Sequence, residues 1–242
     1  MNSYYGFRNI LLILLTLSIF PSCETEKDLN GNGKVTTRSY KVESFNQLNI
    51  DGVLTVYFQQ GEKYAVEVKT DDNLHEIVSV LSEGESLKIF TNTKDNFQAT
   101  VLNVYVTAPS VDAILLNGVT ALYITDTLVQ DELLVTKENT GVLSLNLELE
   151  HFLLNSDGVG EILLKGRADK AYIHNIMLGD IHAFEFIVRN LEISHQGTGN
   201  IELNVIDKLE LDFQGVGNIY CKGNPTEVIK KGNGTGNVFL LE

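Results

Sequence analysis

The sequence predicts an all-β, parallel β-helix-like solenoid with turns of about 19 residues, and the first observation behind this is a repeated phrase. Gly-x-Gly-Asn-Ile, or the same phrase ending in Val, begins at Gly197, Gly215 and Gly234. Weaker copies occupy residues 118–122, 141–145, 158–162 and 177–181. The copies end at residues 122, 145, 162, 181, 201, 219 and 238, so the steps are 23, 17, 19, 20, 18 and 19 residues. A period of this size indicates stacked copies of one structural unit.

The second observation is the pattern on either side of each phrase. In the clearest unit, apolar and polar residues alternate over 191–195 and again over 201–205, with the phrase between them. Such alternation predicts two short strands, each with one apolar face. They are joined by a corner where glycine permits positive φ or close backbone approach. One unit cannot bury its apolar face alone, whereas seven turns stacked in parallel at ~4.8 Å per strand can do so. We therefore expect the last residues of the copies to form one inward-facing row.

The third observation is that the segment before the repeats is also rich in strand patterns. Residues 53–58, 64–68, 87–90 and 101–106 are β-branched, aromatic or alternating, and turn residues separate them. This N-terminal section therefore adds further strands to the repeats.

One stretch of the N-terminal section has helical spacing instead. It follows the capping residues Asp72 and Asn73 and places apolar side chains on one helical stripe. The stripe consists of Leu74, Ile77, Val78 and Leu81. We therefore expect one short helix over residues 72–81.

The first 38 residues predict export and anchoring. Arg8 precedes an apolar run over residues 10–20, which is too short to span a bilayer but suits the core of a signal peptide. A small residue, Cys23 and an acidic tail follow at once, and this arrangement resembles a bacterial lipoprotein signal. We expect residues 1–22 to be the signal peptide, Cys23 to carry lipid, 23–38 to be a flexible tether, and 39–242 to be the domain. Secretion with ordinary cleavage nearby is the alternative.

Composition restricts the remaining function classes. The chain is 43% hydrophobic and 21% charged, as expected of a folded protein. Its net charge of −14 argues against binding nucleic acid, which needs a basic stripe. Of the two cysteines, lipid on Cys23 would leave Cys221 without a disulfide partner. Cys221 lies two residues after Ile219 on a strand, so we expect it to be a buried apolar side chain.

Several segments together resemble one known family. They are residues 45–52, 66–74, 87–89 and 104–109, with the Gly-x-Gly-Asn-Ile phrases, and the likeness covers roughly residues 40–242. The chain resembles the family called putative auto-transporter adhesin, head GIN domain, which is known from envelope proteins of Bacteroidetes and relatives. The resemblance implies a β-solenoid, a location outside the cytoplasm and an adhesive role. It implies no catalytic residues, and fold alone does not establish function.

The residue before the last position of each copy is a candidate site position. These residues are Ala121, Ser144, Glu161, Asp180, Asn200, Asn218 and Asn237. Stacked asparagines indicate a hydrogen-bonded ladder. Two carboxylates on adjacent turns, Glu161 and Asp180, leave a Ca²⁺ site open as a less favoured alternative. The five histidines form no metal-binding spacing, and we interpret His195 as a hydrogen-bonded core residue.

The sequence favours a non-enzymatic lipoprotein of the cell envelope, an adhesin or a structural or interaction module that uses the faces of the solenoid. A carbohydrate-binding or carbohydrate-active β-helix protein is the alternative, and an enzyme of this class would need acid and base groups clustered in a cleft. The chain has no Trp and no long insertion between turns to wall such a cleft. We expect no catalytic or cofactor-binding residue.

The expected partners are a membrane, through the lipid, and a protein or glycan that the sequence does not identify. The expected location is the outer membrane, facing the periplasm or the surface. Because the repeats continue to residue 242, we also expect self-association through the last turn or shielding of its edge.

Overall fold

The computed structural model of the chain describes residues 29–93 and 95–241. The N-terminal section contains β1 (Leu29–Asn30), β2 (Val35–Tyr40), β3 (Gln47–Asp51), β4 (Val53–Gln60), β5 (Ala65–Asp71), the 3₁₀ turn η1 (His75–Ile77), β6 (Val78–Glu83), β7 (Ser86–Thr91), β8 (Phe97–Gln98) and β9 (Leu102–Ala108). The repeat region contains β10 (Ala113–Val129), β11 (Glu132–Thr140), β12 (Leu143–Val159), β13 (Ile162–Asn175), β14 (Ile181–His195), β15 (Ile201–Phe213), β16 (Ile219–Lys222), β17 (Glu227–Lys231) and β18 (Val238–Leu240). Within these ranges, no helix has the length and apolar character needed to cross a membrane.

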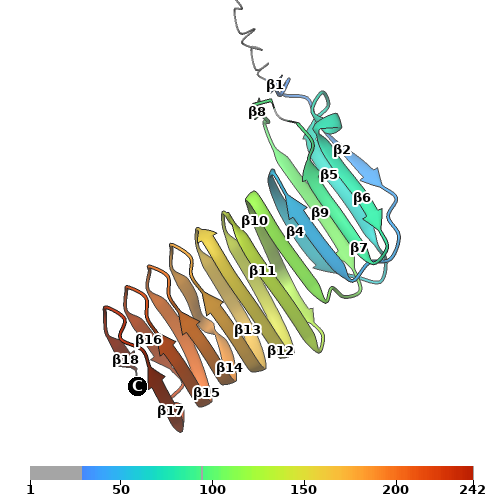
Figure 1. Ribbon diagram of the computed structural model, residues 1–242. Coiled ribbons are helices and arrows are strands. Elements are labelled where there is room, and N and C mark those ends of the chain that lie inside the picture. Colours follow the sequence, from blue (N-terminus) through green and yellow to red (C-terminus); the bar gives the residue numbers. More distant parts are fainter. Residues whose placement is uncertain (1–28, 94, 242) are drawn as a thin grey trace, which may run out of the picture.

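Strand pairing follows two series, which form the two faces of a flattened solenoid (Figure 1). Face A consists of β4, the middle of β10, the first halves of β12 to β15, then β16 and β18. Face B consists of β3, the start of β10, β11, the second halves of β12 to β15, and β17. Strands β2, β5 and β9 extend face A, and β6 and β7 extend face B. The fold class predicted from the sequence is confirmed.

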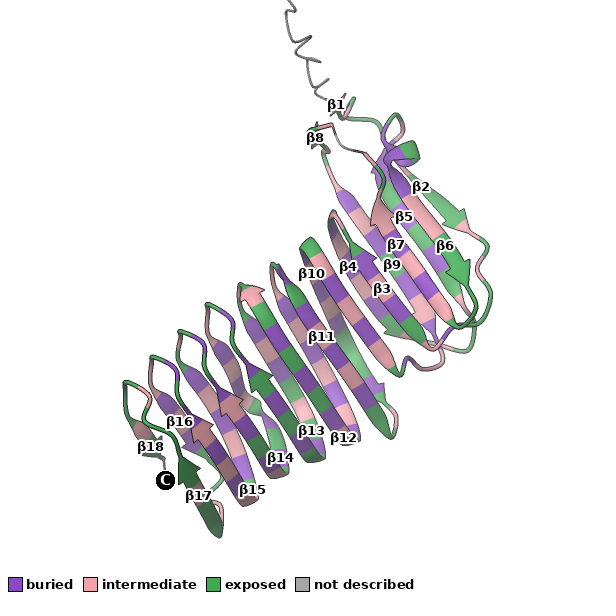
Figure 2. Cartoon of the chain, viewed as in Figure 1, coloured by how far each residue is buried: buried purple, intermediate pink, exposed green. Residues whose placement is uncertain are grey.

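Two kinds of corner join the faces. The chain passes from face B to face A at the Gly-x-Gly phrases, which we call the glycine corners. It returns to face B inside the long strands, near Glu150, Asp169 and Arg189, and we call these bends the second corners. Along both faces, buried and exposed residues alternate (Figure 2). The interior is therefore packed with side chains contributed by every turn.

The inward row expected from the repeat is present, with one correction to its register. The row consists of Leu122, Leu143, Ile162, Ile181, Ile201, Ile219 and Val238, each paired with the next. All are fully buried except Val238 in the last turn. From the sequence we expected Leu145 in this row, but Leu143, two residues earlier, occupies the position. The two could not be told apart because both are apolar and both point inward. Ser144 is consequently not in the column that contains Asp180 and Asn200, and Val142 takes its place.

The one short helix expected in the N-terminal section is present as a 3₁₀ turn, but its expected extent over residues 72–81 is wrong. Only His75–Ile77 forms a 3₁₀ turn, and Val78–Glu83 is strand β6, which pairs with β7. Leu74, Ile77 and Val78 are buried as expected, whereas Leu81 is exposed. The β-branched Val78 and Val80 suit a strand, and the hydrogen bonds of β7 outweigh the weak helical preference of so short a stretch.

Strand pairing extends to residues before 39, where we expected the domain to begin. Leu29–Asn30 pairs with Phe97–Gln98, and Val35–Tyr40 pairs with β5. The carboxylate of Asp71 fastens this segment by accepting hydrogen bonds from the backbone N–H groups of Gly33 and Thr100, both at 2.7 Å. These bonds lower the pKa of Asp71 against the opposing effect of its desolvation. The signal peptide, Cys23 and the start of the expected tether lie outside the described residues.

The last turn carries an exposed lysine that the strand register places in an inward row, at the uncovered end of the solenoid. Lys230 on β17 stands opposite Leu211, in a row that is otherwise apolar along face B. Within the described chain, β17 pairs only with β15 and β18 only with β16, so both present an open edge. An inward-pointing charge at a sheet edge opposes pairing with a second chain.

Replacing Lys230 with Ile should therefore increase end-to-end self-association. We expect a dimer or larger species that grows with concentration in sedimentation velocity. Lys231→Ile is the matched control, because Lys231 is the next residue on β17 and points outward beside Asp212. Equal behaviour of the two variants would contradict the role given to Lys230.

Candidate contact surfaces

A buried polar row fills the interior beside the glycine corners. It runs from Lys137 through Ser156 and Asn175 to His195, on four consecutive turns. Ser156 donates to Asn175 Oδ1 at 2.8 Å, and the Asn175 amide nitrogen lies 2.9 Å from His195 Nδ1. The next residue in the row is Phe213, which stacks on the His195 ring at 5.7 Å between centroids. Burial lowers the pKa of His195, and the interpretation of this histidine as a core residue is consistent with these contacts.

The asparagine column forms a ladder. Each of its hydrogen bonds joins a backbone N–H group to a side-chain oxygen, and none joins two side-chain amides. Asp180 Oδ1 accepts from the backbone N–H of Asn200 at 2.7 Å, and Asn200 Oδ1 accepts from that of Asn218 at 3.0 Å. Asn218 Oδ1 then accepts from the N–H of Asn237 at 3.1 Å. Each side chain therefore fastens the glycine corner of the next turn.

The two acidic members of this column lie on neighbouring turns, as expected. Glu161 precedes Ile162, whose N–H donates to the carbonyl oxygen of Asp180 at 3.1 Å. Asp180 already uses Oδ1 in the ladder. Across the described residues, no three His, Cys, Asp or Glu side chains gather as a metal site would require. The geometry therefore adds nothing in favour of a cation between Glu161 and Asp180.

The cysteines have separate outcomes. Cys23, the expected lipid attachment residue, lies outside the described residues. Cys221 points inward, is 1% exposed, and stands between Leu203 and Leu240 on adjacent strands. Burial raises the pKa of its thiol to about 11, so it carries no thiolate near neutral pH. Cys221 is a packing residue, as expected.

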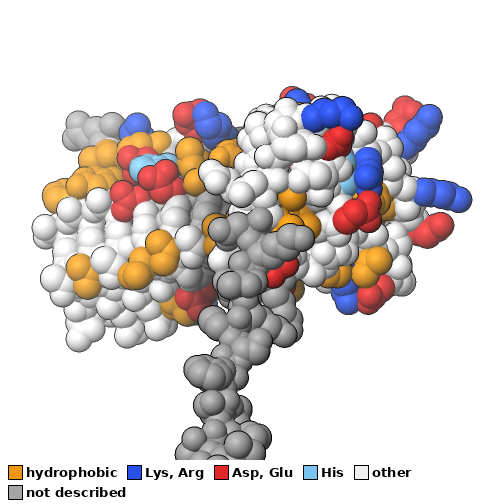
Figure 3. Space-filling model, turned by 90° about the horizontal axis from the view of Figure 1, so that it is seen from above, with side chains coloured by type: hydrophobic (Ala, Val, Ile, Leu, Met, Phe, Trp, Pro, Cys, Tyr) orange, Lys and Arg blue, Asp and Glu red, His pale blue; other side chains and the backbone are white. Residues whose placement is uncertain are grey.

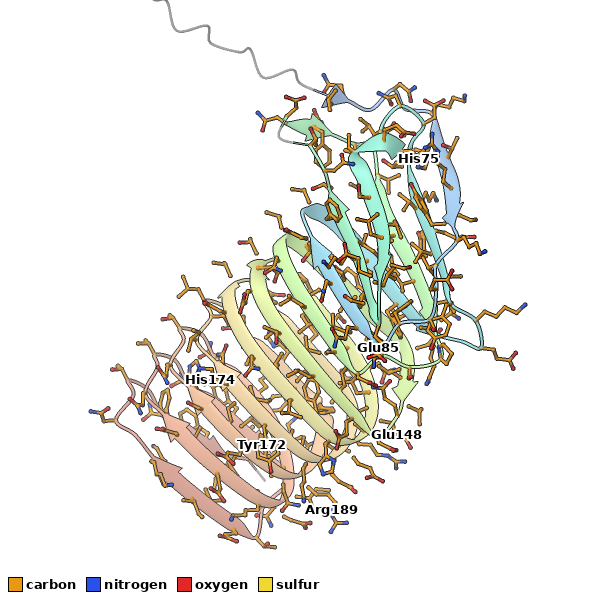
Figure 4. The ribbon with its side chains drawn as sticks, turned by 45° about the vertical axis from the view of Figure 1, so that its right-hand side comes forward. His75, Glu85, Glu148, Tyr172, His174 and Arg189 are labelled. Carbon is orange, nitrogen blue, oxygen red and sulfur yellow. The ribbon has the colours of Figure 1, made fainter. Side chains whose placement is uncertain are left out.

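A large hollow lies along the second corners, and we call it the second-corner groove. Its volume is about 770 Å³, and buried Leu149 and Ala168 are among the residues that line it. Three exposed apolar side chains also line it, namely Val129, Ile187 and Ile206, with exposed fractions of 52%, 44% and 42%. Figure 4 shows two other members, Glu148 and Arg189, near this edge of the solenoid.

The second-corner groove carries an excess of negative charge. Arg167 pairs with Glu148 across adjacent turns, and Arg189 Nη2 lies 2.7 Å from Asp207 Oδ2. Both arginines are thus neutralised. Asp131, Glu150 and Asp169 also line the groove on successive turns, and none of them forms an ion pair within the described chain. A second hollow of about 610 Å³ shares Asp131 and Glu150 and adds Asp112 and Glu132.

Sequence reasoning missed this groove. Asp131, Glu150 and Asp169 are scattered over nearly 40 residues, and each is an ordinary polar residue in its own segment. The signal that could have found them is the repeat itself. A step of 19 residues separates 131 from 150 and 150 from 169, so the same period that stacks the turns also aligns these carboxylates.

Face A carries a short row of tyrosines. The Tyr57 ring stacks between Tyr105 and Tyr123, with centroids 5.3 Å and 5.4 Å away and interplanar angles of 15° and 19°. Rings stacked in this way cover each other's faces and present their edges to solvent. The row therefore offers little of the open aromatic face on which sugars commonly stack.

Comparisons with known proteins agree with this architecture. The family described as "putative auto-transporter adhesin, head GIN domain" matches residues 44–225. A putative adhesin from Bacteroides fragilis is 26% identical, with a TM-score of 0.84, and the match covers 88% of this chain and 100% of that one. A putative adhesin from Parabacteroides merdae is 24% identical over 89% and 99% of the two chains, with a TM-score of 0.65.

A protein from Parabacteroides distasonis, described as a putative lipid binding protein, has the same fold at 21% identity and a TM-score of 0.71, over 89% of this chain and 100% of that one. A search of curated proteins finds no match. The family match covers most of the chain, and it includes the N-terminal section from β3 onward and all but the last turn of the repeats. This chain belongs to the putative auto-transporter adhesin, head GIN domain family.

Proposed function

We propose that this protein is a non-enzymatic, lipid-anchored component of the bacterial cell envelope that makes adhesive contacts through the second-corner groove. The observation that carries the proposal is the combination of unpaired carboxylates and exposed apolar side chains in one hollow of about 770 Å³. Exposed apolar patches with a polar rim are typical of interaction sites. Membership of an adhesin-like family supports the same class of function.

The charge of the groove defines the partner. Asp131, Glu150 and Asp169 would attract Lys and Arg side chains, whereas Val129, Ile187 and Ile206 would contact apolar ones. A partner surface that is basic and partly apolar therefore fits best. The chain's net charge of −14 would accelerate the encounter with such a partner at low ionic strength.

The contact can be tested with a synthetic peptide of alternating Lys and Leu, using one of Glu and Leu as the negative probe. We expect the full chain to bind the first peptide, with affinity that falls as salt rises. The double variant Glu150→Lys, Asp169→Lys should weaken binding roughly tenfold, because two attractions of ~0.5–1 kcal/mol each are lost.

The matched control is Glu43→Lys, Glu62→Lys, which makes the same change in net charge at exposed positions of the N-terminal section. If the control variant loses as much affinity as the groove variant, only the overall charge matters and the groove is not the site. Binding of the Glu-Leu peptide with equal affinity would also contradict the proposal.

A carbohydrate-active function is the second candidate, and the three groove carboxylates are the observation that favours it. Acid and base carboxylates facing one cleft are what glycoside hydrolysis requires. Incubating the full chain with a panel of polysaccharides and measuring new reducing ends tests this directly. Activity that disappears in Glu150→Gln would establish the second candidate, and absence of product across the panel would leave the adhesive function favoured.

The anchored location rests on the lipoprotein-like segment around Cys23. Mass spectrometry of the mature N-terminus should find an acylated Cys23, and Cys23→Ser should release the protein from the membrane fraction. Protease treatment of intact cells then distinguishes a surface orientation from a periplasmic one.

A further inference from the structure

Another hollow, of about 520 Å³, has no charged side chain among the described residues that line it; we call it the uncharged cleft. It lies between β8 and the first glycine corners of β4 and β10. Its apolar lining includes Val53, Leu54, Phe97, Ala99, Leu102 and Val119. In a chain that is 21% charged, a hollow lined mainly by apolar side chains is a departure from the rest of the surface.

The rim of the uncharged cleft is exposed and continues along the glycine corners. Val53 and Val119 pair side by side and are 50% and 52% exposed. The same outward column goes on through Val159, Leu178 and Val216, all of which are exposed. Figure 3 views the molecule from above, and hydrophobic side chains recur there among uncharged ones, with acidic side chains beside some of them.

Strand β1, at which the described part of the chain begins, lies at this cleft. Leu29 on β1 pairs with Phe97 on β8, and Phe97 lines the cleft. We expected the domain to begin at residue 39, but β1 already begins at Leu29. Only six residue steps therefore separate β1 from Cys23. A fully extended chain covers ~3.3–3.6 Å per residue, so Leu29 lies within about 20 Å of the Cys23 backbone. A lipid on Cys23 would therefore hold this end of the domain close to the bilayer.

We infer that the uncharged cleft contacts the acyl chains of the bilayer in which the N-terminal lipid is inserted. The inference rests on the proposed lipid anchoring at Cys23. Exposed valines and an apolar hollow gain from transfer out of water, and no charge in the lining opposes that transfer. Acidic residues flank the cleft: Asp51 lies beside Gly118, Asp95 precedes Phe97 by two residues, and Asp71 bonds to Thr100, the residue after Ala99. Their charge favours neutral over anionic lipid.

The absence of Trp from the sequence makes the contact measurable. Phe97→Trp places a single fluorophore in the cleft, and Phe239→Trp places one at the far end of the solenoid on β18. Each lipidated full-length variant is inserted into phosphatidylcholine vesicles that contain a lipid with a nitroxide near the top of its acyl chain. We expect loss of emission from the Phe97→Trp protein and unchanged emission from the Phe239→Trp protein.

Two substitutions that each add a charge, one at the rim of the uncharged cleft and one far from it, provide a matched pair of variants. Adding Val119→Asp to Phe97→Trp should restore the emission, whereas Val216→Asp, in the same exposed column five turns away, should not. Unquenched Phe97→Trp in protein that floats with the vesicles would overturn the inference and leave the anchor intact. Equal quenching of the two Trp positions would mean that no particular surface faces the bilayer, which also overturns it. Failure to float with vesicles would refute the anchor itself and with it this contact.

Discussion

Gly217→Ala should be among the most destabilising single substitutions in the chain. Gly217 has φ of +131°, and a Cβ at this position would overlap the carbonyl oxygen of Gly199 on the preceding turn. That oxygen belongs to the backbone of a packed corner and has no freedom to move aside. Positive φ contributes ~1–2 kcal/mol, and separation of the turns brings the total to about 4 kcal/mol or more. We expect thermal unfolding to begin about 10 °C lower.

Gly84→Ala separates the cost of positive φ from the cost of pushing neighbouring turns apart. Gly84 also has positive φ, +60°, but nothing lies within 4 Å of the position that its Cβ would occupy. This variant should therefore lose only the ~1 kcal/mol that left-handed backbone requires. If circular dichroism melts show similar losses for the two substitutions, close stacking of the corners is not what the glycines provide.

The effect should be transmitted along the solenoid. Repeat proteins are held together mainly by contacts between neighbouring turns, and Gly199, Gly217 and Gly236 occupy the same position on successive turns. Hydrogen exchange should accordingly increase at Ile201 and Ile219 before it increases in β4 or β9. This distribution would show that the glycine corner acts on its own turns and not through the whole domain.

The periodicity of the glycines was sufficient to predict the fold because the physical constraint repeats with it. Each Gly-x-Gly corner must approach the previous corner closely, and each following apolar residue must enter the same interior. Where a copy lacks these constraints, prediction failed. The 141–145 copy has a single glycine and two inward-pointing leucines, so the sequence alone could not choose between Leu143 and Leu145. Strand pairing with Leu122 and Ile162 makes the choice.

The errors in the N-terminal section have a different cause. Residues 72–81 satisfy helical spacing, and only the antiparallel pairing of β6 with β7, two separate segments, selects the strand. Val35–Tyr40 is a polar stretch that becomes a strand because β5 offers an open edge. Each segment contains β-branched residues that suit a strand, but these alone do not decide the outcome. Contacts between segments decided both.

The buried polar row could have been predicted from strand alternation, although composition pointed the other way. Lys137 lies in the polar stretch Thr136–Thr140, which by composition belongs on the surface. Strand alternation, however, continues from Leu133 and Val135 to Lys137 and places all three on the same face. The repeat then aligns Lys137 with Ser156, Asn175 and His195. A charged residue on an inward position was the available signal.

Lys137 should make the stability of the protein rise with pH. The residue is fully buried, and its ammonium group donates only to the carbonyl oxygens of Asn139 and Val159, at 3.0 Å and 3.2 Å. Burial lowers the pKa of Lys137 from 10.5 to about 8, and attraction to Asp157 offsets a smaller part. Below pH 8 both the folded and the unfolded chain hold this proton, and the folded chain bears the full penalty of a buried charge. Between pH 8 and 10.5 the folded chain releases it first, so the free energy of unfolding increases, by roughly 3 kcal/mol in total.

Replacing Lys137 with Met removes this dependence, and comparison of the two proteins cancels the other groups that titrate in the same range. At pH 7 we expect the Met variant to be more stable by ~1–3 kcal/mol, because an apolar side chain of similar length replaces a buried charge. By pH 10 the free energy of unfolding of the wild-type protein should have risen to nearly that of the Met variant. Urea unfolding at pH 7, 8, 9 and 10 measures this, and Lys170→Met, at an exposed position of β13, is the control. If wild type and Lys137→Met keep a constant difference over this range, Lys137 does not lose its proton while folded, and the charge must be stabilised inside the solenoid by more than two carbonyl groups.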